Sequence, residues 1–373
     1  MTTEARALEL IDRVRSRPAA FKDAQVTMAH GAGGKASRTL VEGLLAPALG
    51  VATLDDAAYL RRLDGAGQGA QVPALPAPER ETVDDLALTT DSFVVRPIRF
   101  PGGSIGKLAV NGTVNDLAVS GARPLALTLS LVLEEGLAAD DLRAEVEAIA
   151  AAAAAADVQV VAGDTKVVER GRCDSMYVTT TGLGRVDPRA SLDARSVRPG
   201  DRVVVSGSVG EHGTAVMLAR GEFELDAPVE SDTRALWPAV DALLDAVGPS
   251  LRVMRDATRG GIATVLNELA RPADVGVVVH EARIPVRPPV VGACEILGID
   301  PMYVANEGVF VAIVAPDVAD RAVAALREVE GCEEAAEVGE VRDEPQAMVL
   351  LQTAFGGRRV LDLLVGDPLP RIC

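Results

Sequence analysis

Two sequence patterns alternate along the first half of the chain: short apolar runs, and stretches with apolar residues at helical spacing. The runs predict buried strands, and the helical spacing predicts amphipathic helices that cover them. The predicted strands are residues 86–90, 124–133, 158–162 and 175–182, and the predicted helices are residues 39–45, 105–120 and 140–156. Strands alternate with helices to about residue 185, which is typical of an α/β domain.

A second series of strands and helices follows a turn-rich connection at residues 188–200 (PRASLDARSVRPG). Its predicted strands are residues 201–206, 275–280, 309–314 and 347–351, and its predicted helices are residues 213–220, 236–246 and 261–270. We therefore predict two domains, over residues 26–187 and 198–355, after a variable leader at residues 1–25. Two prolines in the final DPLPRIC exclude a helix there, so residues 356–373 are predicted to form a flexible tail.

The composition agrees with a globular two-domain chain. The 373 residues are 48% hydrophobic and 24% charged, and the aromatic share of 3% leaves the cores to Val, Leu, Ile and Ala. Acidic residues outnumber basic ones by 54 to 37, so the formal net charge is −17. Such a surface repels nucleic acid and anionic membranes, and neither is an expected partner. A polyphosphate ligand would need metal ions to offset the same repulsion.

The four cysteines, Cys173, Cys294, Cys332 and Cys373, are far apart and form no CxxC pair. This spacing argues against a structural zinc site and against a disulfide framework. The N-terminal residues lack an apolar signal-peptide core and no apolar run approaches membrane-spanning length, so we expect a cytoplasmic protein. Cys373 stands out, because an unpaired cysteine at a mobile cytosolic terminus is chemically exposed. A chance free thiol is the alternative.

A glycine-rich segment, HGAGGKAS at residues 30–37, comes close to a phosphate-binding loop without matching one. Walker A requires GxxxxGK[ST], whereas here the spacing is compressed and an alanine follows Lys35. The backbone N–H groups of Gly31, Gly33 and Gly34 could still approach phosphates, since glycines have no Cβ atom. For the segment taken alone, a flexible turn ahead of the predicted helix is the better interpretation.

Acidic side chains recur at predicted strand ends, beside small residues. They are Asp55, Asp56, Asp91, Asp116 and Asp164. Each alone is best explained as a cap or turn residue. Five such acids in one domain fit a site for several Mg²⁺ ions better, because hard cations require several oxygen ligands. Asn111 and Asn115 are four residues apart, so they share one face of the helix predicted at residues 105–120.

Three further motifs carry charged candidates. The segment DATRGG, from Asp256 to Gly261, opens a helix, so its backbone donors, the helix dipole and Arg259 could together form an anion site. A capped surface helix with a solvated arginine is equally consistent with the segment. Lys166 in GDTK and Glu307 in ANEG stand beside glycines, and either could be an ordinary surface residue.

Taken in order, these motifs resemble the HypE family of hydrogenase maturation proteins, in the PurM-like (AIR synthase) superfamily. The resemblance extends from about residue 26 to Cys373. It is carried by AHGAGG, TTDSFVVRPIRFPGGSIGKLAVNGTVNDLAVSGARP, GDTKVVERG, RPGDRVVVSGSVGEHG, MRDATRGGIATVLNELA, ACEILGIDPMYVANEG and the terminal LPRIC. The PRIC ending is the most specific part, because related synthases and kinases of the superfamily do not share it. The Gly/Ala/Pro-rich loop insertion at residues 61–80 departs from the family pattern, and Lys35 stands at a position where the family is variable.

The resemblance implies a PurM-like two-domain fold. It consists of an N-terminal α/β dimerisation and ATP-binding domain, which pairs with its twin in a homodimer, and a C-terminal α+β domain over the nucleotide cleft. The resemblance also implies the reaction. A carbamoyltransferase, HypF, places a carbamoyl group on the C-terminal cysteine, and ATP with Mg²⁺ drives its dehydration to a thiocyanate. The cyanide then passes to iron on a HypC–HypD scaffold complex, for [NiFe]-hydrogenase assembly.

The same resemblance implies a role for each candidate residue. Cys373 would carry the substrate, Glu307 would act as the base, and Lys166 would hold the amide oxygen or the departing phosphate. The expected nucleotide and phosphate contacts are Gly31, Gly33, Gly34, Asn111, Asn115, Thr258 and Arg259. The expected ligands of Mg²⁺ and the triphosphate are Asp55, Asp56, Asp91, Asp116, Asp164 and Asp256.

Two other functions are compatible with the motifs. An ATP-dependent kinase or synthetase acting on a free small molecule would use the acids and glycines but leave LPRIC without a purpose. A non-enzymatic maturation scaffold that presents its tail to partners would leave the aspartates without one. Removal of Cys373 separates the first from a tail-modifying enzyme, and Asp91→Ala separates the second from any enzyme.

Overall fold

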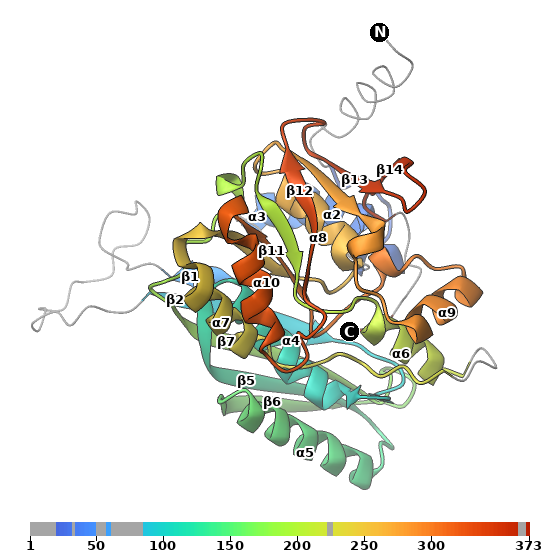
Figure 1. Ribbon diagram of the computed structural model, residues 1–373. Coiled ribbons are helices and arrows are strands. Elements are labelled where there is room, and N and C mark those ends of the chain that lie inside the picture. Colours follow the sequence, from blue (N-terminus) through green and yellow to red (C-terminus); the bar gives the residue numbers. More distant parts are fainter. Residues whose placement is uncertain (1–19, 32–33, 50–56, 61–84, 222–226, 365–370) are drawn as a thin grey trace, which may run out of the picture.

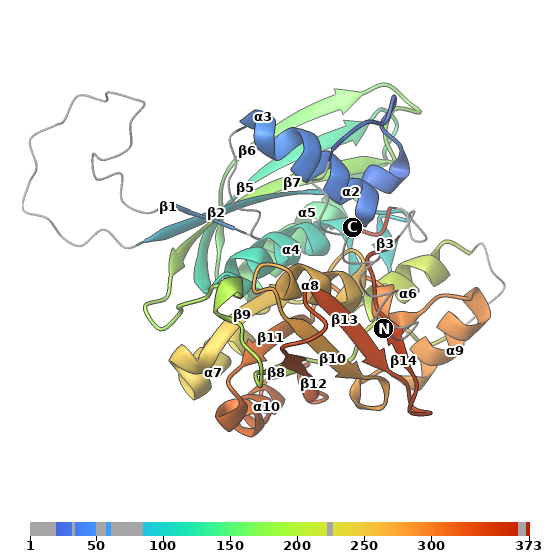
Figure 2. The same ribbon diagram turned by 90° about the horizontal axis from the view of Figure 1, so that it is seen from above.

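The computed structural model describes residues 20–31, 34–49, 57–60, 85–221, 227–364 and 371–373. Most of the strands in this part of the chain belong to a five-stranded sheet and a seven-stranded sheet, and β3 (Arg99–Phe100) with β4 (Gly103–Ser104) forms a separate two-stranded ribbon. The C-terminus lies between the two larger sheets in both views of the molecule (Figures 1 and 2). The end of the chain is thus close to the junction of the two halves.

The N-terminal half is built on the five-stranded sheet, in the order β1-β2-β7-β5-β6. Its strands are β1 (Ala58–Leu60), β2 (Leu86–Phe93), β5 (Ala122–Glu134), β6 (Gln159–Val168) and β7 (Met176–Val186). Buried residues alternate with partly exposed ones along β7, as expected of a strand with one covered face. Helix α4 (Ile105–Val119) packs on β2, β5 and β7, and α5 (Ala139–Ala155) packs beside it.

A group of short helices precedes this sheet. They are a 3₁₀ turn at Met28–Gly31, α2 (Lys35–Leu40), a π-helical turn at Val41–Leu45 and α3 (Ala46–Leu49). The helix predicted over residues 39–45 is therefore wrong in its bounds, because helical structure begins at Lys35, directly after the glycines. A glycine N-cap without a side chain that bonds the first turn gave no sequence signal for this start.

The C-terminal half is built on the seven-stranded sheet, in the order β14-β13-β10-β12-β8-β11-β9. Its strands are β8 (Arg202–Val205), β9 (Leu251–Asp256), β10 (Gly276–His280), β11 (Phe310–Val314), β12 (Ala336–Arg342), β13 (Met348–Gln352) and β14 (Arg358–Val360). Its helices are α6 (Glu211–Ala219), α7 (Trp237–Val247), α8 (Gly261–Ala270), α9 (Pro288–Leu297) and α10 (Ala319–Arg327). The mixture of helices and strands in two halves confirms the predicted fold class.

Three large apolar clusters hold these layers together. One joins α8 to one set of side chains of the seven-stranded sheet, and a second joins α7 and α10 to the other set. The third lies between the two halves, with Phe93 and Leu108 from the first and Val216 and Val304 from the second. Ile372, next to the last residue, is buried in this third cluster at 3% exposure. The domain boundaries drawn from the sequence stay predictions.

Candidate functional site

Glu307 lies on the loop before β11 and is only 3% exposed. The N–H groups of Glu307 and Gly308 donate to the carboxylate of Asp232 at 3.1 and 3.0 Å. Asn115 on α4 donates from Nδ2 to the Glu307 carbonyl oxygen at 3.1 Å. The side-chain oxygen Oε1 of Glu307 has no hydrogen-bond partner among the described residues. The backbone of this residue is thus fixed while part of its carboxyl group is left for another partner.

The electrostatic surroundings of Glu307 favour proton uptake. Burial raises the pKa of Glu307 well above its ordinary value, and the negative charges of Asp256, Asp232 and Asp91 raise it further. The positive charge of Arg259 acts in the opposite direction. A carboxylate with a raised pKa is a stronger proton acceptor, so Glu307 suits the role of a general base.

Two aspartates meet beside this residue. Asp91 on β2 contacts the carboxyl group of Asp116 on α4, which also accepts a hydrogen bond from Thr89 Oγ1 at 2.8 Å. Burial raises the pKa of Asp91, while the charge of Arg259 and the contact with Asp116 lower it in part. A pair of carboxyl groups in contact is a hard-oxygen donor set of the kind that Mg²⁺ prefers.

The thiol of Cys373 reaches this group of charges. The thiol contacts the guanidinium group of Arg259 and the carboxyl group of Glu307, and it interacts electrostatically with Asp91. Burial raises the pKa of the Cys373 thiol to about 12, with Arg259 opposing and the two acids adding to the rise. The sulfur of the last residue therefore lies beside the proposed base, in a position where it stays protonated.

This environment predicts that Cys373 reacts slowly with alkylating reagents in the native protein. A thiol of ordinary pKa 9.0 is partly ionised at pH 8, and the rise to about 12 lowers its thiolate fraction by about 10³-fold. Docking of the tail thus shifts the ionisation of this thiol to higher pH. Iodoacetamide labelling at pH 8, followed by the mass of the C-terminal peptide from an aspartate-directed digest, measures this rate. Equal rates in the native and urea-unfolded chain would contradict the docked position.

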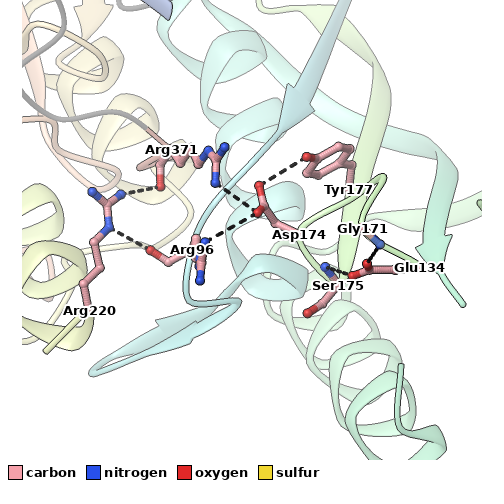
Figure 3. A network of polar contacts seen from close by, with 8 residues as sticks. All are labelled: Arg96, Glu134, Gly171, Asp174, Ser175, Tyr177, Arg220 and Arg371. Atoms are coloured by element: carbon pink, nitrogen blue, oxygen red, sulfur yellow. Dashed lines mark hydrogen bonds and ion pairs between the residues drawn. The ribbon is translucent and has the colours of Figure 1, made fainter. Parts of the chain in front are cut away.

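Several contacts hold the terminal tripeptide in place (Figure 3). Arg371 donates from Nη1 to Asp174 Oδ1 at 3.0 Å, and its carbonyl oxygen accepts from the Arg96 N–H and from Arg220 Nη2. Glu134, at the end of β5, accepts from the N–H groups of Gly171 and Ser175, so it shapes the turn that presents Asp174. Ion pairing and backbone bonding thus dock the last residues, although their flexibility in solution stays a prediction.

The predicted glycine loop contributes through its backbone. Gly31 accepts a hydrogen bond from Arg259 Nη1 at 2.5 Å, so the loop helps to orient this guanidinium. A Cβ atom on Gly34 would lie 2.6 Å from the Leu364 carbonyl oxygen, and this oxygen accepts from the Lys35 N–H at 3.0 Å. The segment that leads to the tail therefore packs directly on the loop. Gly33 lies outside the described residues, as do Asp55 and Asp56.

The two predicted asparagines share one face of α4, as expected, but they serve the junction between the halves. Asn111 donates to Thr233 Oγ1 at 3.1 Å. Asn115 donates to the carbonyl oxygens of Arg234 and Glu307 and accepts from the Leu236 N–H. Both side chains are buried. Their contacts position the loop that carries Glu307, so a role in nucleotide contact stays a prediction.

The remaining predicted residues lie in two places, one near Glu307 and the other at a distant edge of the five-stranded sheet. Asp256 ends β9 and is 6% exposed, and Thr258 and Arg259 follow it in a turn that requires Gly260 and Gly261, both at positive φ. Lys166 instead donates to Asp164 on the exposed edge strand β6. Strands β7 and β5 separate this pair from Asp91 on β2, so one chain does not bring Lys166 to Glu307.

The placement of the aspartates at strand ends is wrong in three cases. Asp91 lies inside β2, Asp164 lies in the middle of β6, and Asp116 lies in the last turn of helix α4. Strands β2 and β6 continue past Asp91 and Asp164 because they stay paired with β7 and β5 beyond these acids. Polar residues on a partly exposed sheet face therefore concealed the true strand ends from the apolar pattern.

The structure adds three residues that the sequence did not single out. Asp232 fixes the backbone of Glu307, Asp174 binds Arg371, and His212 contacts the carbonyl oxygen of Ile372. Asp232 and Asp174 lie in loops without a motif, so spacing gave no signal for either. His212 belongs to the SGSVGEHG turn, where a histidine beside glycines was the available hint.

The residues that the structure describes contain no group of three or more His, Cys, Asp or Glu side chains placed to hold a metal ion. None of the helices in this part of the chain has the length and apolar character needed to cross a bilayer.

Comparison with known proteins identifies the class to which this fold and site belong. Residues 55–186 match the family described as AIR synthase related protein, N-terminal domain, and residues 198–351 match its C-terminal counterpart. The chain is therefore an AIR synthase-related protein with both domains of that class.

Full-length relatives define the family within the class. The carbamoyl dehydratase HypE of Rhodobacter capsulatus is 46% identical over 354 residues, which cover 95% of this chain and all of the relative. A solved HypE–HypF complex aligns with a TM-score of 0.77 at 39% identity, over 87% of this chain and 99% of the other. A HypE structure in complex with ATP aligns at 0.74 and 39% identity, over 94% and 100%. The chain belongs to the HypE family of carbamoyl dehydratases.

Proposed function

We propose that this protein uses ATP to dehydrate a carbamoyl group carried on its own Cys373, which becomes a thiocyanate. The observation that carries the proposal is the position of the Cys373 thiol, in contact with Glu307 and Arg259 and beside Asp91. The relatives named as carbamoyl dehydratases support it, as does the relative solved with ATP. The product would supply the cyanide ligand of the iron in [NiFe]-hydrogenase assembly.

The chemistry removes one oxygen and two protons from the group S–C(=O)–NH₂. ATP supplies a phosphoryl group that turns the amide oxygen into a leaving group, and the oxygen departs in inorganic phosphate. Glu307 accepts an N–H proton as the C≡N bond forms, and the second proton leaves with phosphate or to solvent. Arg259 lies beside the sulfur, where its positive charge stabilises the negative charge that develops on the oxygen.

The described residues fit a magnesium–triphosphate site in part. Asp91 and Asp116 present two carboxyl groups in contact, and the charge of Asp256 reaches Glu307 from the other half. Oxygen ligands of this kind suit Mg²⁺ rather than a softer metal. We propose that Mg²⁺ bound by these acids offsets the repulsion between them and the phosphates. The proposed ligand set also includes Asp55 and Asp56, outside the described residues, and Asp164 on the edge strand β6.

Edge strand β6 supports the proposed homodimer. Nine of its ten residues are exposed, and the apolar Val160, Val161 and Val167 are among them. A long unpaired edge with apolar side chains is a ready surface for a second strand. Because Lys166 and Asp164 lie on this strand, a second copy is required for Lys166 to act at the amide oxygen.

The remaining partners follow from the reaction. We propose HypF as the carbamoyl donor, supported by the solved HypE–HypF complex, and a HypC–HypD scaffold as the acceptor of cyanide. The four cysteines are free thiols, which suits the reducing cytoplasm where we place the reaction.

Intact-mass analysis tests the proposed function directly. A carbamoylated sample of the protein should lose the mass of one water from its C-terminal peptide when Mg²⁺ and ATP are added, and only then. Cys373→Ser is the control, and it should show neither modification. If the carbamoyl mass persists while ATP is consumed, the proposal is wrong. Undiminished ATP turnover on a small molecule by Cys373→Ser would favour a kinase instead.

A further inference from the structure

The last peptide carbonyl of the chain, that of Ile372, is held by a buried histidine. His212 is the second residue of α6, and its side chain is fully buried. Its Nε2 atom lies 2.9 Å from the Ile372 carbonyl oxygen, and its Nδ1 atom lies 2.7 Å from Ser231 Oγ. The ring of Phe100 stands edge-on at 5.3 Å between centroids and restricts rotation of the imidazole.

These contacts assign the tautomer of His212. A carbonyl oxygen only accepts hydrogen bonds, so Nε2 carries the hydrogen and donates to Ile372. The neutral ring then accepts at Nδ1 from the Ser231 hydroxyl, whose oxygen in turn accepts from the Thr233 N–H at 3.2 Å. Burial lowers the pKa of His212, which keeps the ring neutral. Each polar atom of the imidazole therefore has one partner of the correct kind.

The segment formed by residues 231–233 connects the carrier to the proposed base. Ser231 orients His212, and Asp232 binds the N–H groups of Glu307 and Gly308. The next residue of the segment, Thr233, accepts from Asn111 on α4, which ties it to the other half of the molecule. One short stretch of backbone therefore contacts both the histidine that holds the tail and the residue proposed as the base.

We infer that His212 is a positioning residue for the sulfur-bound group: oriented by Ser231, it holds the Ile372 carbonyl and so keeps the Cys373 sulfur beside Glu307. The inference rests on the proposed function. The Ile372 carbonyl belongs to the planar peptide unit that ends at the Cys373 Cα atom, so fixing this plane leaves few torsions free before the sulfur. Orientation of this kind matters because small displacements of reacting groups lower rates steeply.

The other anchors of the tail act further from the sulfur. Asp174 and Arg220 hold Arg371, and the side chain of Ile372 is buried in the apolar cluster between the halves. These contacts would keep the tail docked even without the imidazole. Loss of His212 should therefore slow the chemical step while the tail remains bound and protected.

His212→Leu tests whether the imidazole acts on the chemical step rather than on docking of the tail. The substitution replaces the hydrogen-bond donor with an apolar side chain. In single-turnover dehydration of the carbamoylated chain, the rate constant should fall by about 10²-fold, with the half-saturating ATP concentration unchanged. The carbamoylated tail should remain as resistant to carboxypeptidase as in the parent. His212→Gln retains a side-chain donor and should restore most of the rate. His280→Leu, a histidine at the end of β10 outside the site, is the matched control and should be unaffected.

The outcomes separate the inference from the function on which it rests. If the parent protein loses no water with Mg²⁺ and ATP, the proposed function fails. If the parent loses water and His212→Leu does so at the parental rate, the positioning role is overturned. Should His212→Leu fail to fold, Ser231→Ala keeps the imidazole but removes its orienting partner. A slower chemical step at unchanged ATP half-saturation supports the role in that variant, and a parental rate overturns it.

Discussion

Glu307→Gln should lower the single-turnover rate of dehydration by about 10²–10⁴-fold, the range expected when a general base is lost. The amide has nearly the shape of the carboxyl group but cannot accept the N–H proton. In the parent, the rate should rise with pH through the raised pKa of Glu307, because the ionised form is the active one. The variant should lose this dependence, and ATP binding measured by calorimetry should persist. Rapid-quench sampling with intact-mass detection measures the rate.

A second acid with a raised pKa, the partly buried Glu211, provides the matched control for this prediction. Burial raises the pKa of Glu211 to about 7, but its carboxylate pairs with Arg287 rather than with the tail. Glu211→Gln should therefore keep the parental rate and its pH dependence. A parental rate in Glu307→Gln, or an equal loss in both variants, would contradict the assignment of Glu307 as the base.

The sequence was sufficient for the fold wherever one side-chain pattern decided an element. The apolar run at residues 309–314 predicted β11 (Phe310–Val314), whose five residues are all buried. The sequence did not reveal β12 (Ala336–Arg342), because two glutamates and an arginine interrupt its apolar positions. This strand is specified by its neighbours, since it lies between β8 and β10 and bonds to both. A strand that is specified by its neighbours need not show an alternating hydrophobic pattern in its own sequence.

Only those site residues that belong to a sequence motif could be predicted. The motifs around Asp91, Asp116, Asp256, Arg259 and Glu307 predicted site residues, and the structure brings these residues together. Asp232 lies 75 residues from Glu307 in the chain, so their contact has no sequence signature. Lys166 shows a second limit of the sequence. It belongs to a motif, but it lies on an edge strand that a single chain does not bring to its own Glu307.

Asp91→Asn should raise the melting temperature of the ligand-free protein while lowering Mg²⁺-dependent turnover by about 10²–10³-fold. In the folded state the pKa of Asp91 is raised above 3.8, so its ionised form is disfavoured relative to the unfolded chain. The stability linked to this group is complete below the unfolded pKa and decreases as pH rises through the folded one. An amide does not ionise and avoids this loss. The same substitution removes a ligand from the proposed metal site, so stability and activity should change in opposite directions.

Asp187→Asn is the matched control, because Asp187 has the opposite electrostatic sign. Its hydrogen bonds with Arg189 lower the pKa of Asp187, so its charge stabilises the fold above the unfolded pKa and this stability is lost as pH falls. Asp187→Asn should lower the melting temperature at pH 7 and leave turnover per folded molecule unchanged. Scanning calorimetry at pH 7 without ligand, together with turnover across a Mg²⁺ titration, measures both quantities. If Asp91→Asn instead destabilised the protein and kept its turnover, Asp91 would be a structural acid rather than part of a metal–triphosphate site.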